Sequence, residues 1–336
     1  HACRRPVAGM GTMCRAAQWF MGRPCGPARR RSWWQWRGQG RGAWRNLARL
    51  EEHYLQKVDF YPYDIRDERM LRSVFLQHHI DSIIHFAALK SVPESVRKPQ
   101  LYHDNNVGGS KTLMAVAKEF HVKNFIFSSS ATVYGDPQYL PIDEDHRIRA
   151  SNPYGQSKID TENLLINDNY FSGDCSTKIL RYFNPVGGHP DGLITEKPHG
   201  VPDNLMPYIL GVASQKYPYL KVYGDDYPTP DGSAIRDYIH IMDLIDAHLL
   251  ALNYDVRGIA LFNVGTGRGV SVLEMLHAFE EANNMEVPFE VYPRRAGDAC
   301  SVFADPKKIQ QLLGWSAKRD LRSMCRDALQ SGHREG

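Results

Sequence analysis

From Val58 onward, short runs of apolar residues alternate with longer segments in which apolar residues recur at helical spacing. The clearest apolar runs predict strands at Val58–Tyr63, Asp81–Ala87, Asn124–Ser128 and Lys178–Phe183. Strands that alternate with helices are typical of an α/β domain with a parallel sheet. We therefore predict an α/β fold, in which the loop-like composition from Asn184 to Asn204 marks the passage to a second, smaller region.

The helices are indicated by periodicity and by the residues that begin them. Between the second and third predicted strands, the i, i+3, i+4, i+7 spacing is met by Leu113, Val116, Ala117 and Phe120. Asn152-Pro153 predicts another helix start, with asparagine as N-cap and proline in the first helical position. Ser271 and Glu274 have the spacing of a capping box and predict a third helix.

Three of the predicted strands end in small or polar residues. These ends are His85–Lys90, Phe127–Thr132 and Arg181–Pro185. In an open parallel sheet, ligands bind beyond the carboxyl ends of the strands. We therefore expect the polar groups of these three segments to converge on one site.

A second chemical feature is the sequence Tyr154-Gly155-Gln156-Ser157-Lys158 on the helix that follows Asn152. Residues four apart share a helix face, so the Lys158 ammonium is expected near the Tyr154 phenol. A free tyrosine has a pKa of about 10, and a nearby positive charge lowers the pKa by favouring the phenolate. Tyr154 is then a candidate general base for a hydroxyl group that Ser130 also binds. With seventeen tyrosines a Tyr-x-x-x-Lys pair is weak evidence by itself, but the preceding serine-rich strand end gives it weight.

The first fifty residues differ from the rest of the chain. They hold eleven arginines and five of the six tryptophans, but no lysine or carboxylate. A basic tail for nucleic acid or anionic lipid is one interpretation, while the features of transit and signal peptides are missing. Because such a composition arises when GC-rich DNA is translated out of frame, we predict that residues 1–45 are an aberrant segment, not native to the fold. The chain begins at His1, so we also expect it to be a fragment.

The remaining composition is that of an ordinary globular protein, with 42% hydrophobic and 24% charged residues. No run of eighteen apolar residues predicts a membrane span. The six cysteines show no zinc-type spacing, so we predict no metal site and reduced thiols in a cytoplasmic protein. We expect neither nucleic acid nor membrane as a partner.

Five strings of residues together resemble the UDP-glucose 4-epimerases of the extended short-chain dehydrogenase/reductase superfamily. They are FSSSATVYG at 127–135, NPYGQSK at 152–158, LRYFNPVG at 180–187, DNLMPY at 203–208 and RDYIH at 236–240. The similarity runs from about Tyr61 to Asp327. It implies a Rossmann-like doubly wound parallel sheet with a smaller C-terminal substrate-binding region. The implied division is an NAD-binding domain at 46–184 and a mainly UDP-sugar-binding domain at 185–336.

The resemblance also implies roles for individual residues. The catalytic residues it implies are Ser130, Tyr154 and Lys158. The residues it implies for NAD are Asp64, Ile65, Phe86, Ala87, Ala88, Leu89, Lys90, Asn105 and Phe183. The residues it implies for the UDP portion of the substrate are Asn184, Asn204, Leu205, Tyr223, Arg236, Arg295 and Asp298. Two of these have a simpler explanation, because Arg236 could pair with Asp237 and Asn204 could cap a helix.

The implied reaction is the interconversion of UDP-glucose and UDP-galactose by inversion at C4 through a 4-keto sugar, with tightly held NAD. Two alternatives remain open. One is a related enzyme for UDP-N-acetylhexosamines or other nucleotide sugars, and the other is an inactive fragment or non-catalytic binder. Members of the family are often dimers, so a homodimer is possible.

The sequence departs from the family at its beginning. The family opens with a strand and a glycine-rich turn that lets the backbone approach the cofactor pyrophosphate. The glycines at Gly38, Gly40 and Gly42 follow no apolar strand and open no predicted helix. We therefore expect this chain to fold poorly and to bind NAD weakly. A smaller departure is Gly188, where the family commonly has alanine, and we expect it to be tolerated.

Overall fold

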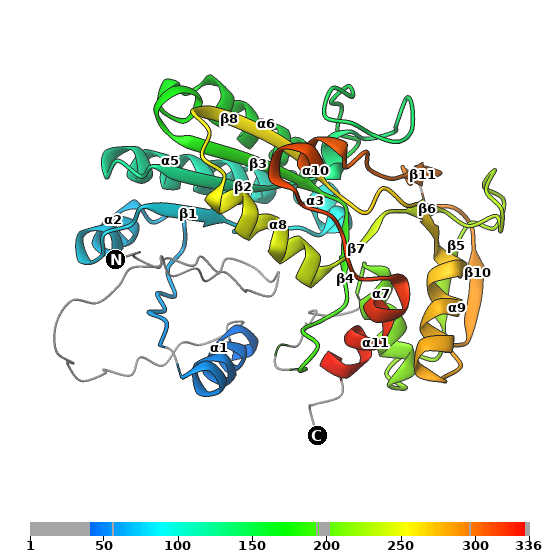
Figure 1. Cartoon of the computed structure of the whole chain (residues 1–336). Coiled ribbons are helices and arrows are strands. Elements are labelled where there is room, and N and C mark those ends of the chain that lie inside the picture. The colour runs from blue at the N-terminus through cyan, green and yellow to red at the C-terminus, as the bar shows by residue number, and fades with distance from the viewer. Residues whose placement is uncertain (1–40, 56, 193, 195–201, 296, 333–336) are drawn as a thin grey trace.

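The computed structural model describes residues 41–55, 57–192, 194, 202–295 and 297–332 (Figure 1). The α-helices in this part of the chain are α1 Arg41–Tyr54, α2 Glu68–Gln77, α3 Val92–Arg97, α4 Pro99–Tyr102, α5 Gly109–Glu119, α6 Pro153–Asn167, α7 Leu205–Ala213, α8 Ile241–Asn253, α9 Val272–Asn283, α10 Lys307–Leu313 and α11 Leu321–Gly332. Shorter helical segments are the π-helices η1 His103–Gly108 and η3 Tyr170–Asp174 and the 3₁₀-helix η2 Ala131–Val133. The strands are β1 Ser82–His85, β2 Asn124–Ser130, β3 Ser176–Tyr182, β4 Asn184–Val186, β5 Leu220–Tyr223, β6 Ile235–Arg236, β7 Tyr238–His240, β8 Gly258–Val264, β9 Val270–Ser271, β10 Phe289–Tyr292 and β11 Ser301–Val302.

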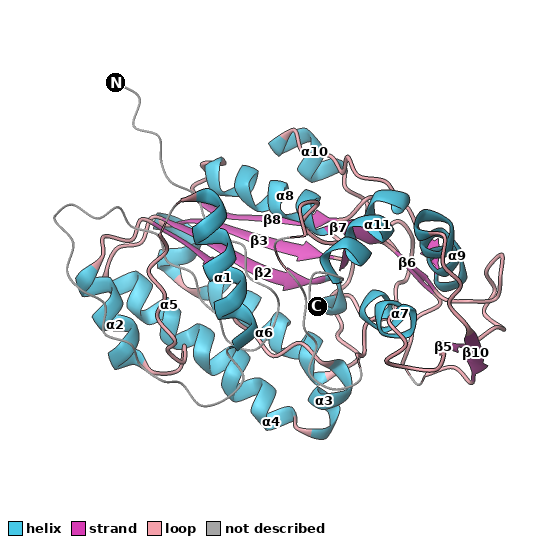
Figure 2. Ribbon diagram, turned by 90° about the horizontal axis from the view of Figure 1, so that it is seen from below, coloured by secondary structure: helices cyan, strands magenta, loops and turns pink. Residues whose placement is uncertain are grey.

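The main sheet has the order β1-β2-β3-β8, and all of its strands are parallel. Helices α2, α5 and α6 lie on one side of it, and α8 and α10 lie on the other (Figure 2). Because both faces are covered, β3 is buried at every residue and β2 at all but its first, as expected for a parallel sheet. The predicted α/β fold is confirmed, as are three of the four predicted strands, with ends that differ by a few residues.

The prediction of a strand at Val58–Tyr63 is wrong. This segment has no regular secondary structure, although Tyr61 and Tyr63 pack against the core beneath α2 and α5. A strand exists only where its backbone groups pair with a neighbouring strand. In the described part of the chain, β1 is the edge of the main sheet and has only β2 beside it. Side-chain packing and the contact of the Tyr61 hydroxyl with the His78 ring, rather than strand pairing, therefore hold 58–63 against the core.

The helix starts follow the sequence signals. The Asn152 side chain accepts a hydrogen bond from Gly155 N at 2.9 Å and begins α6. The Ser271 side chain accepts from Glu274 N at 2.9 Å and begins α9. The Glu274 carboxylate, however, accepts from Arg268 at 2.6 Å, so only half of the predicted capping box is formed by these contacts. The predicted apolar face of α5 is buried at Leu113, Val116 and Ala117, and Phe120 lies at its C-cap.

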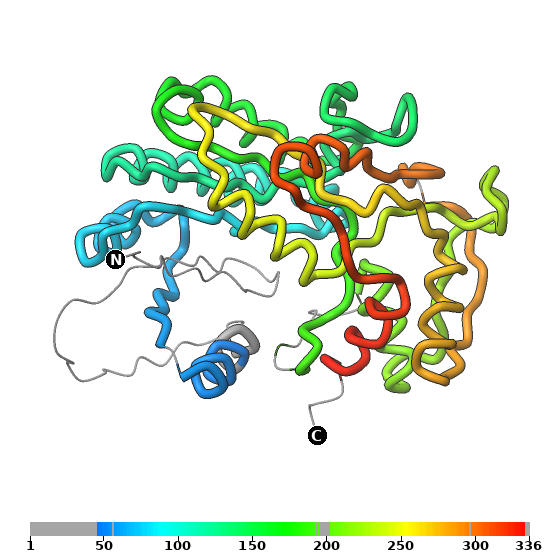
Figure 3. Tube along the Cα trace, in the orientation of Figure 1, coloured from blue at the N-terminus to red at the C-terminus, as the bar shows by residue number. Residues whose placement is uncertain are grey.

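Beyond β3 the chain builds three small sheets, β4 with β7, β5 with β10, and β6 with β9 and β11. Strand β4 begins at Asn184, inside the stretch predicted to be loop-like. Between β7 and β9 the chain returns to the main sheet through α8 and β8, and it completes the small sheets afterwards (Figure 3). Residues from both halves of the sequence therefore form the main sheet, and the domain boundary at 184/185 stays a prediction.

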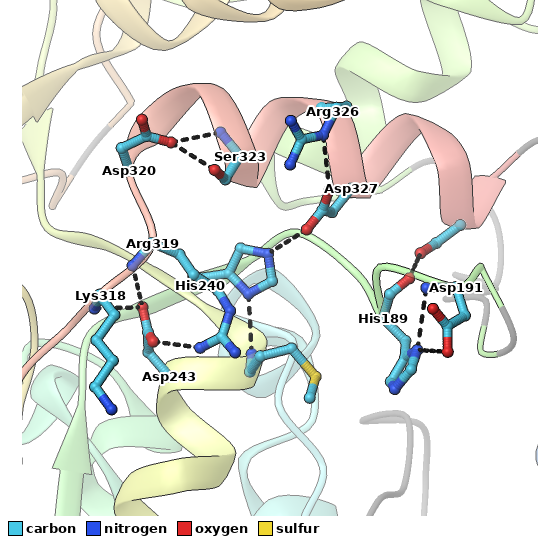
Figure 4. A network of polar contacts seen from close by, with 12 residues as sticks. His189, Asp191, His240, Asp243, Lys318, Arg319, Asp320, Ser323, Arg326 and Asp327 are labelled. Atoms are coloured by element: carbon cyan, nitrogen blue, oxygen red, sulfur yellow. Dashed lines mark hydrogen bonds and ion pairs between the residues drawn. The ribbon is translucent and has the colours of Figure 1, made fainter.

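Helix α11 is tied to the rest of the molecule by a buried polar network (Figure 4). The His240 ring on β7 donates from Nε2 to the Asp327 carboxylate at 3.2 Å and accepts from Met242 N at Nδ1. The Asp243 carboxylate accepts from the backbone of Arg319 at 3.0 Å and forms an ion pair with its guanidinium. Burial lowers the pKa of His240. These contacts fix β7, which pairs with β4 directly after the main sheet.

Most of the predicted aberrant segment, residues 1–40, lies outside the described residues. Helix α1 begins at Arg41, and Leu47 on it is buried. No helix of the described part has the length and hydropathy to cross a bilayer. The described residues also contain no cluster of three or more side chains suited to a metal ion.

Candidate active site

The candidate catalytic residues come from β2 and α6, which lie side by side. Asn152 starts α6 such that Tyr154, Lys158 and Glu162 follow one another at four-residue intervals. All three are nearly buried, with relative exposures of 9%, 4% and 1%. Ser130, the last residue of β2, is 9% exposed and accepts hydrogen bonds from the backbone and side chain of Thr132. The sequence prediction that these side chains approach one another agrees with this arrangement.

The electrostatics of Tyr154 differ from the expectation. Burial raises the pKa of Tyr154 to about 12, against a smaller lowering by its hydrogen bond with Ser130. The Lys158 ammonium lies 5.9 Å from the centre of the Tyr154 ring and donates instead to the Ser128 carbonyl at 2.7 Å. The lysine is therefore one helical turn from the phenol, as predicted, but burial sets the direction of the Tyr154 pKa shift.

Lys158 is itself perturbed. Burial lowers the pKa of the ammonium to about 8, while the negative charge of Glu162 raises it. The ammonium also lies 4.9 Å from the centre of the Phe127 ring, a cation–π contact. A lysine with this pKa titrates close to physiological pH, which is typical of functional sites.

The segment that follows β1 was predicted to line the cofactor. Ala87 and Leu89 are buried, whereas Phe86, Ala88 and Lys90 are half-buried. The Phe86 ring contacts the His248 ring with centroids 4.9 Å apart.

Asn106 clamps the same segment. It accepts from Leu89 N at 2.7 Å and donates to Leu89 O at 3.0 Å and to the Ser157 hydroxyl at 2.9 Å. The neighbouring Asn105, a predicted cofactor residue, is buried and donates to the Asn106 side chain. Since Asn105 and Asn106 lie in π-helix η1, this irregular turn joins the segment predicted to line the cofactor to helix α6.

The other predicted cofactor residues lie in different surroundings. The Asp64 carboxylate is 43% exposed and pairs with the Arg66 guanidinium at 2.6 Å, which holds the pKa of Asp64 below its usual range. Ile65 is buried against Gly109 of α5, where a Cβ on the glycine would lie 2.4 Å from the Ile65 side chain. Phe183 is buried in a cluster with Ala131 and Val133, two residues that follow Ser130 in the sequence.

Several residues predicted to hold UDP gather around two tyrosines of the C-terminal region. The charges of Arg236 and Arg295 both act on the pKa of Tyr238, which burial raises to about 12. Arg236, Arg295 and Asp298 likewise act on the pKa of Tyr227, which is raised mainly by burial.

The arginines differ in their contacts. The Arg295 guanidinium stacks 4.5 Å from the Tyr223 ring centre and pairs with Asp298 at 3.0 Å. Arg236 donates to its neighbour's carbonyl, Ile235 O, at 2.7 Å. Its simpler explanation, a pair with Asp237, is not supported, because the Asp237 carboxylate accepts from Thr266, Gly267 and Ala304.

The remaining predicted UDP residues lie on β4 and α7. Asn184 is exposed at the start of β4, and Asn204 is exposed at the N-cap position of α7. The Asn204 side chain makes no capping hydrogen bond, so helix capping does not explain it. Leu205 packs partly against the core beneath α7 and α9.

Sequence reasoning missed Glu162, Arg181 and Asn106. The signal for Glu162 was available, since it follows Lys158 by another four residues on the same helix face. Arg181 was read as part of a polar strand end, although an arginine inside a buried strand requires a partner. The role of Asn106 depends on a π-helical turn that no local sequence pattern indicates.

The described residues fit one half of an NAD molecule. The buried Ser130, Tyr154 and Lys158 suit a reacting hydroxyl, and the aromatic Phe183 is buried in the cluster that contains Ala131, the residue after Ser130. The glycine-rich turn that would receive the pyrophosphate is not found among residues 41–55 and 57–81, which hold α1, the irregular 58–63 and α2. The fit is therefore to the nicotinamide end.

A parallel α/β sheet whose serine-ended strand faces a Tyr-x-x-x-Lys helix defines a short-chain dehydrogenase/reductase-type enzyme. The family profile described as GDP-mannose 4,6 dehydratase matches residues 37–328. UDP-glucose 4-epimerase of Neisseria meningitidis is 48% identical over 285 residues, which cover 84% of each chain, and that of Bacillus subtilis is 46% identical over 284 residues. The chain belongs to the UDP-glucose 4-epimerase family.

Comparison with solved structures supports the same family assignment. The Stenotrophomonas maltophila UDP-glucose 4-epimerase, with bound NAD and formylated UDP-arabinopyranose, has a TM-score of 0.83 and 44% identity. It covers 85% of this chain, and 86% of that chain is matched. The Bifidobacterium longum enzyme in complex with NAD⁺ and UDP has the same TM-score, with 43% identity and coverages of 86% and 87%. The structural similarity therefore covers 85% and 86% of this chain in the two comparisons.

Proposed function

We propose that this chain acts as a UDP-glucose 4-epimerase, which interconverts UDP-glucose and UDP-galactose by inverting C4 through a 4-keto sugar with NAD as cofactor. The observation that carries this proposal is the buried set of Ser130, Tyr154 and Lys158 at the carboxyl end of β2, in a chain 48% identical to a UDP-glucose 4-epimerase.

Tyr154 takes the proton of the sugar 4-hydroxyl and returns it after the sugar has turned. Ser130 holds the same hydroxyl and stabilises the phenolate by hydrogen bonding. Lys158 supplies a fixed positive charge one turn below. With a pKa of about 12, Tyr154 is almost entirely protonated at neutral pH, so the site needs additional positive charge to favour the phenolate that acts as the base.

NAD⁺ supplies the hydride acceptor and donor for C4 when it is bound, together with the positive charge of its oxidised ring. Phe86, Ala87, Ala88, Leu89, Lys90 and Asn105 would hold its ribose and nicotinamide portions, with Phe183 beside the ring. Asp64 and Ile65 would lie at its adenosine end. The hydrogen bonds of the Asn106 side chain with the Leu89 backbone hold the segment from Phe86 to Lys90 in place.

The UDP portion would be held by Asn184, Asn204, Leu205, Tyr223, Arg236, Arg295 and Asp298. The two arginines suit the pyrophosphate because guanidinium groups form paired hydrogen bonds with phosphate oxygens. Asp298 suits the ribose hydroxyls, and Tyr223 offers an aromatic face. A firm grip on the nucleotide leaves the sugar free to turn, as inversion at C4 requires. A homodimer and a cytoplasmic location stay predictions.

The test is to measure bound NAD and turnover in the purified protein. The protein is denatured, the released NAD is quantified, and epimerase activity is assayed with UDP-galactose and with UDP-N-acetylgalactosamine, with and without added NAD⁺. Turnover of UDP-galactose supports the proposal. Turnover confined to the N-acetylated substrate would assign the related activity instead. No turnover at saturating NAD⁺, from folded protein that still binds UDP, would favour the inactive binder.

A further inference from the structure

Each of the three serines of β2 contacts one residue of α6, Ser129 and Ser130 through their hydroxyls and Ser128 through its backbone carbonyl. Ser130 hydrogen-bonds with Tyr154, the Ser128 carbonyl accepts from Lys158 at 2.7 Å, and the Ser129 hydroxyl donates to Glu162. Tyr154, Lys158 and Glu162 are successive residues on one face of α6. Glu162 is thus the third member of a row whose other two members form the candidate catalytic pair.

Glu162 is fixed from a second direction. The Arg181 guanidinium, on β3, donates to both of its oxygens, with Nε at 3.0 Å from Oε1 and 3.2 Å from Oε2. Arg181 is also held by the Tyr134 hydroxyl at 3.0 Å, and that hydroxyl donates to Asn263 on β8 at 2.6 Å. The side chains of Arg181 and Glu162 are each only 2% exposed. Three neighbouring strands therefore hold one carboxylate in place beneath the lysine.

A buried ion pair of this kind gives little net stability compared with apolar residues of similar volume. Its position next to Lys158 suggests a different use. Burial disfavours the charged ammonium, and the Glu162 charge is the interaction that opposes this effect. The Ser128 carbonyl fixes the direction of the ammonium but carries no full charge.

We propose that Glu162 is a positioning residue for the reaction: held by Arg181 and Ser129, its carboxylate keeps Lys158 charged and aligned along β2. This proposal rests on the proposed function, because it gives a purpose to the charge on Lys158. Glu162 itself touches neither the phenol nor the sugar, and it acts through the lysine.

Other titratable or charged groups also face this lysine or its immediate partners. They are His85 on β1, Tyr154 on α6, Tyr182 and Arg181 on β3, and His248 on α8. Burial lowers the pKa of His85 and of His248, so both rings are neutral at physiological pH, and burial raises the pKa of Tyr182, which is neutral as well. Glu162 is therefore the anion that supports the charge of Lys158.

The test measures the titration of Lys158 directly in the protein without added cofactor or substrate. Lysine is labelled with ¹³C at Cε, its signals are followed by NMR between pH 6 and 11, and Lys158→Met identifies the relevant signal. The parent should titrate with a midpoint of about 8. Glu162→Gln should lower the midpoint by about one unit or more, the effect expected of a nearby charge.

Glu162→Gln leaves Arg181 buried without its partner, so a second variant removes both charges. Glu162→Gln/Arg181→Met replaces the ion pair as a whole, a change that proteins often tolerate, and it should lower the midpoint by a smaller amount, because the positive charge of Arg181 is removed together with the carboxylate. Asp243→Asn is the matched control, because it breaks another buried pair, with Arg319, on α8. It should leave the Lys158 midpoint unchanged.

A midpoint equal to that of the parent in either folded Glu162 variant would overturn the proposal and leave Glu162 with a purely structural role. An equal shift of the Lys158 midpoint in Asp243→Asn would also overturn the proposal, because the shift would then reflect a general loss of packing in the protein. Since the titration needs no turnover, a chain that lacks epimerase activity would refute the proposed function without affecting this result.

Discussion

Two buried histidines make the stability of this protein sensitive to mild acid. His248 donates from Nδ1 to the Leu244 carbonyl at 2.8 Å and accepts from Ser128 at Nε2. His85 donates from Nε2 to Ser110 at 2.8 Å, and its Nδ1 has no hydrogen-bond partner among the described residues. Protonation would place a cation in each of these buried positions. Burial accordingly lowers the pKa of His248 to about 4 and that of His85 to about 3.

The magnitude follows from these pKa values. In the unfolded chain a histidine has a pKa of about 6.5, so the unfolded state binds more protons than the folded state below that pH. The stability contributed by the neutral rings is therefore complete above pH 6.5 and is lost as the pH falls toward 4 and 3. Below pH 6.5, the contribution of each histidine to the free energy of unfolding falls by about 1.4 kcal/mol per pH unit. At pH 5 this is about 2 kcal/mol for each ring, a large share of a typical net stability of about 5–15 kcal/mol.

The assay is urea denaturation followed by circular dichroism between pH 5 and 8. The free energy of unfolding of the parent should fall steeply below pH 6.5. His248→Asn, whose amide is placed to donate to Leu244, and His85→Gln, whose amide is placed to donate to Ser110, should each flatten this dependence by about 1.4 kcal/mol per pH unit.

His79→Gln is the control, because the His79 side chain is 90% exposed, and it should keep the slope of the parent. A parent whose free energy of unfolding is constant from pH 7 to 5, or a His248→Asn variant with the parental slope, would refute the reasoning.

Three further predictions concern single sites. Tyr154→Phe should lower turnover by about 10²–10⁴-fold while calorimetry shows unchanged UDP affinity; unchanged turnover would exclude Tyr154 as the base. Arg181→Met should cost about 3–5 kcal/mol in urea denaturation because it strands the buried Glu162 charge, and adding Glu162→Gln should recover most of this loss; equal stability of the single and double variants would contradict it. Gly188→Ala should cost roughly 1–3 kcal/mol, since its Cβ would lie 1.8 Å from the Ser331 hydroxyl, and adding Ser331→Ala should relieve part of the strain; an unchanged midpoint for Gly188→Ala alone would show that α11 yields easily.

The parts of the fold that the sequence predicted are those set by local signals. Asn152 and Pro153 determine where α6 begins, and this start fixes the face on which Tyr154 and Lys158 lie. The end of β2 could be predicted because its apolar run Phe125–Phe127 stops at three serines, whereas β3 is buried along its whole length although Lys178 and Arg181 interrupt its apolar residues. Gly188 was expected to be tolerated, and the packing of Ser331 against it explains why a residue without a side chain suits this position.

The parts that failed depend on neighbours far away in sequence. The segment 58–63 has the composition of a strand, but pairing decides whether a strand forms, and β1 remains the sheet edge in the described part of the chain. The direction of the Tyr154 pKa shift could not be predicted either. The four-residue spacing places a cation near the phenol, whereas the burial that outweighs it comes from packing against Leu89 and Tyr102.

That raised pKa has a consequence for the order of charge changes in the proposed reaction. A phenol with a pKa of about 12 keeps its proton unless more positive charge comes close. The oxidised nicotinamide carries such a charge, and the reduced ring does not. A bound oxidised nicotinamide would therefore favour the deprotonated form of Tyr154, which acts as the base, and reduction of the ring would favour the protonated form. Lys158 is fixed by Ser128 and supported by Glu162, so it supplies a constant positive potential at the Tyr154 phenol. A bound cofactor would supply the part of this potential that changes during turnover.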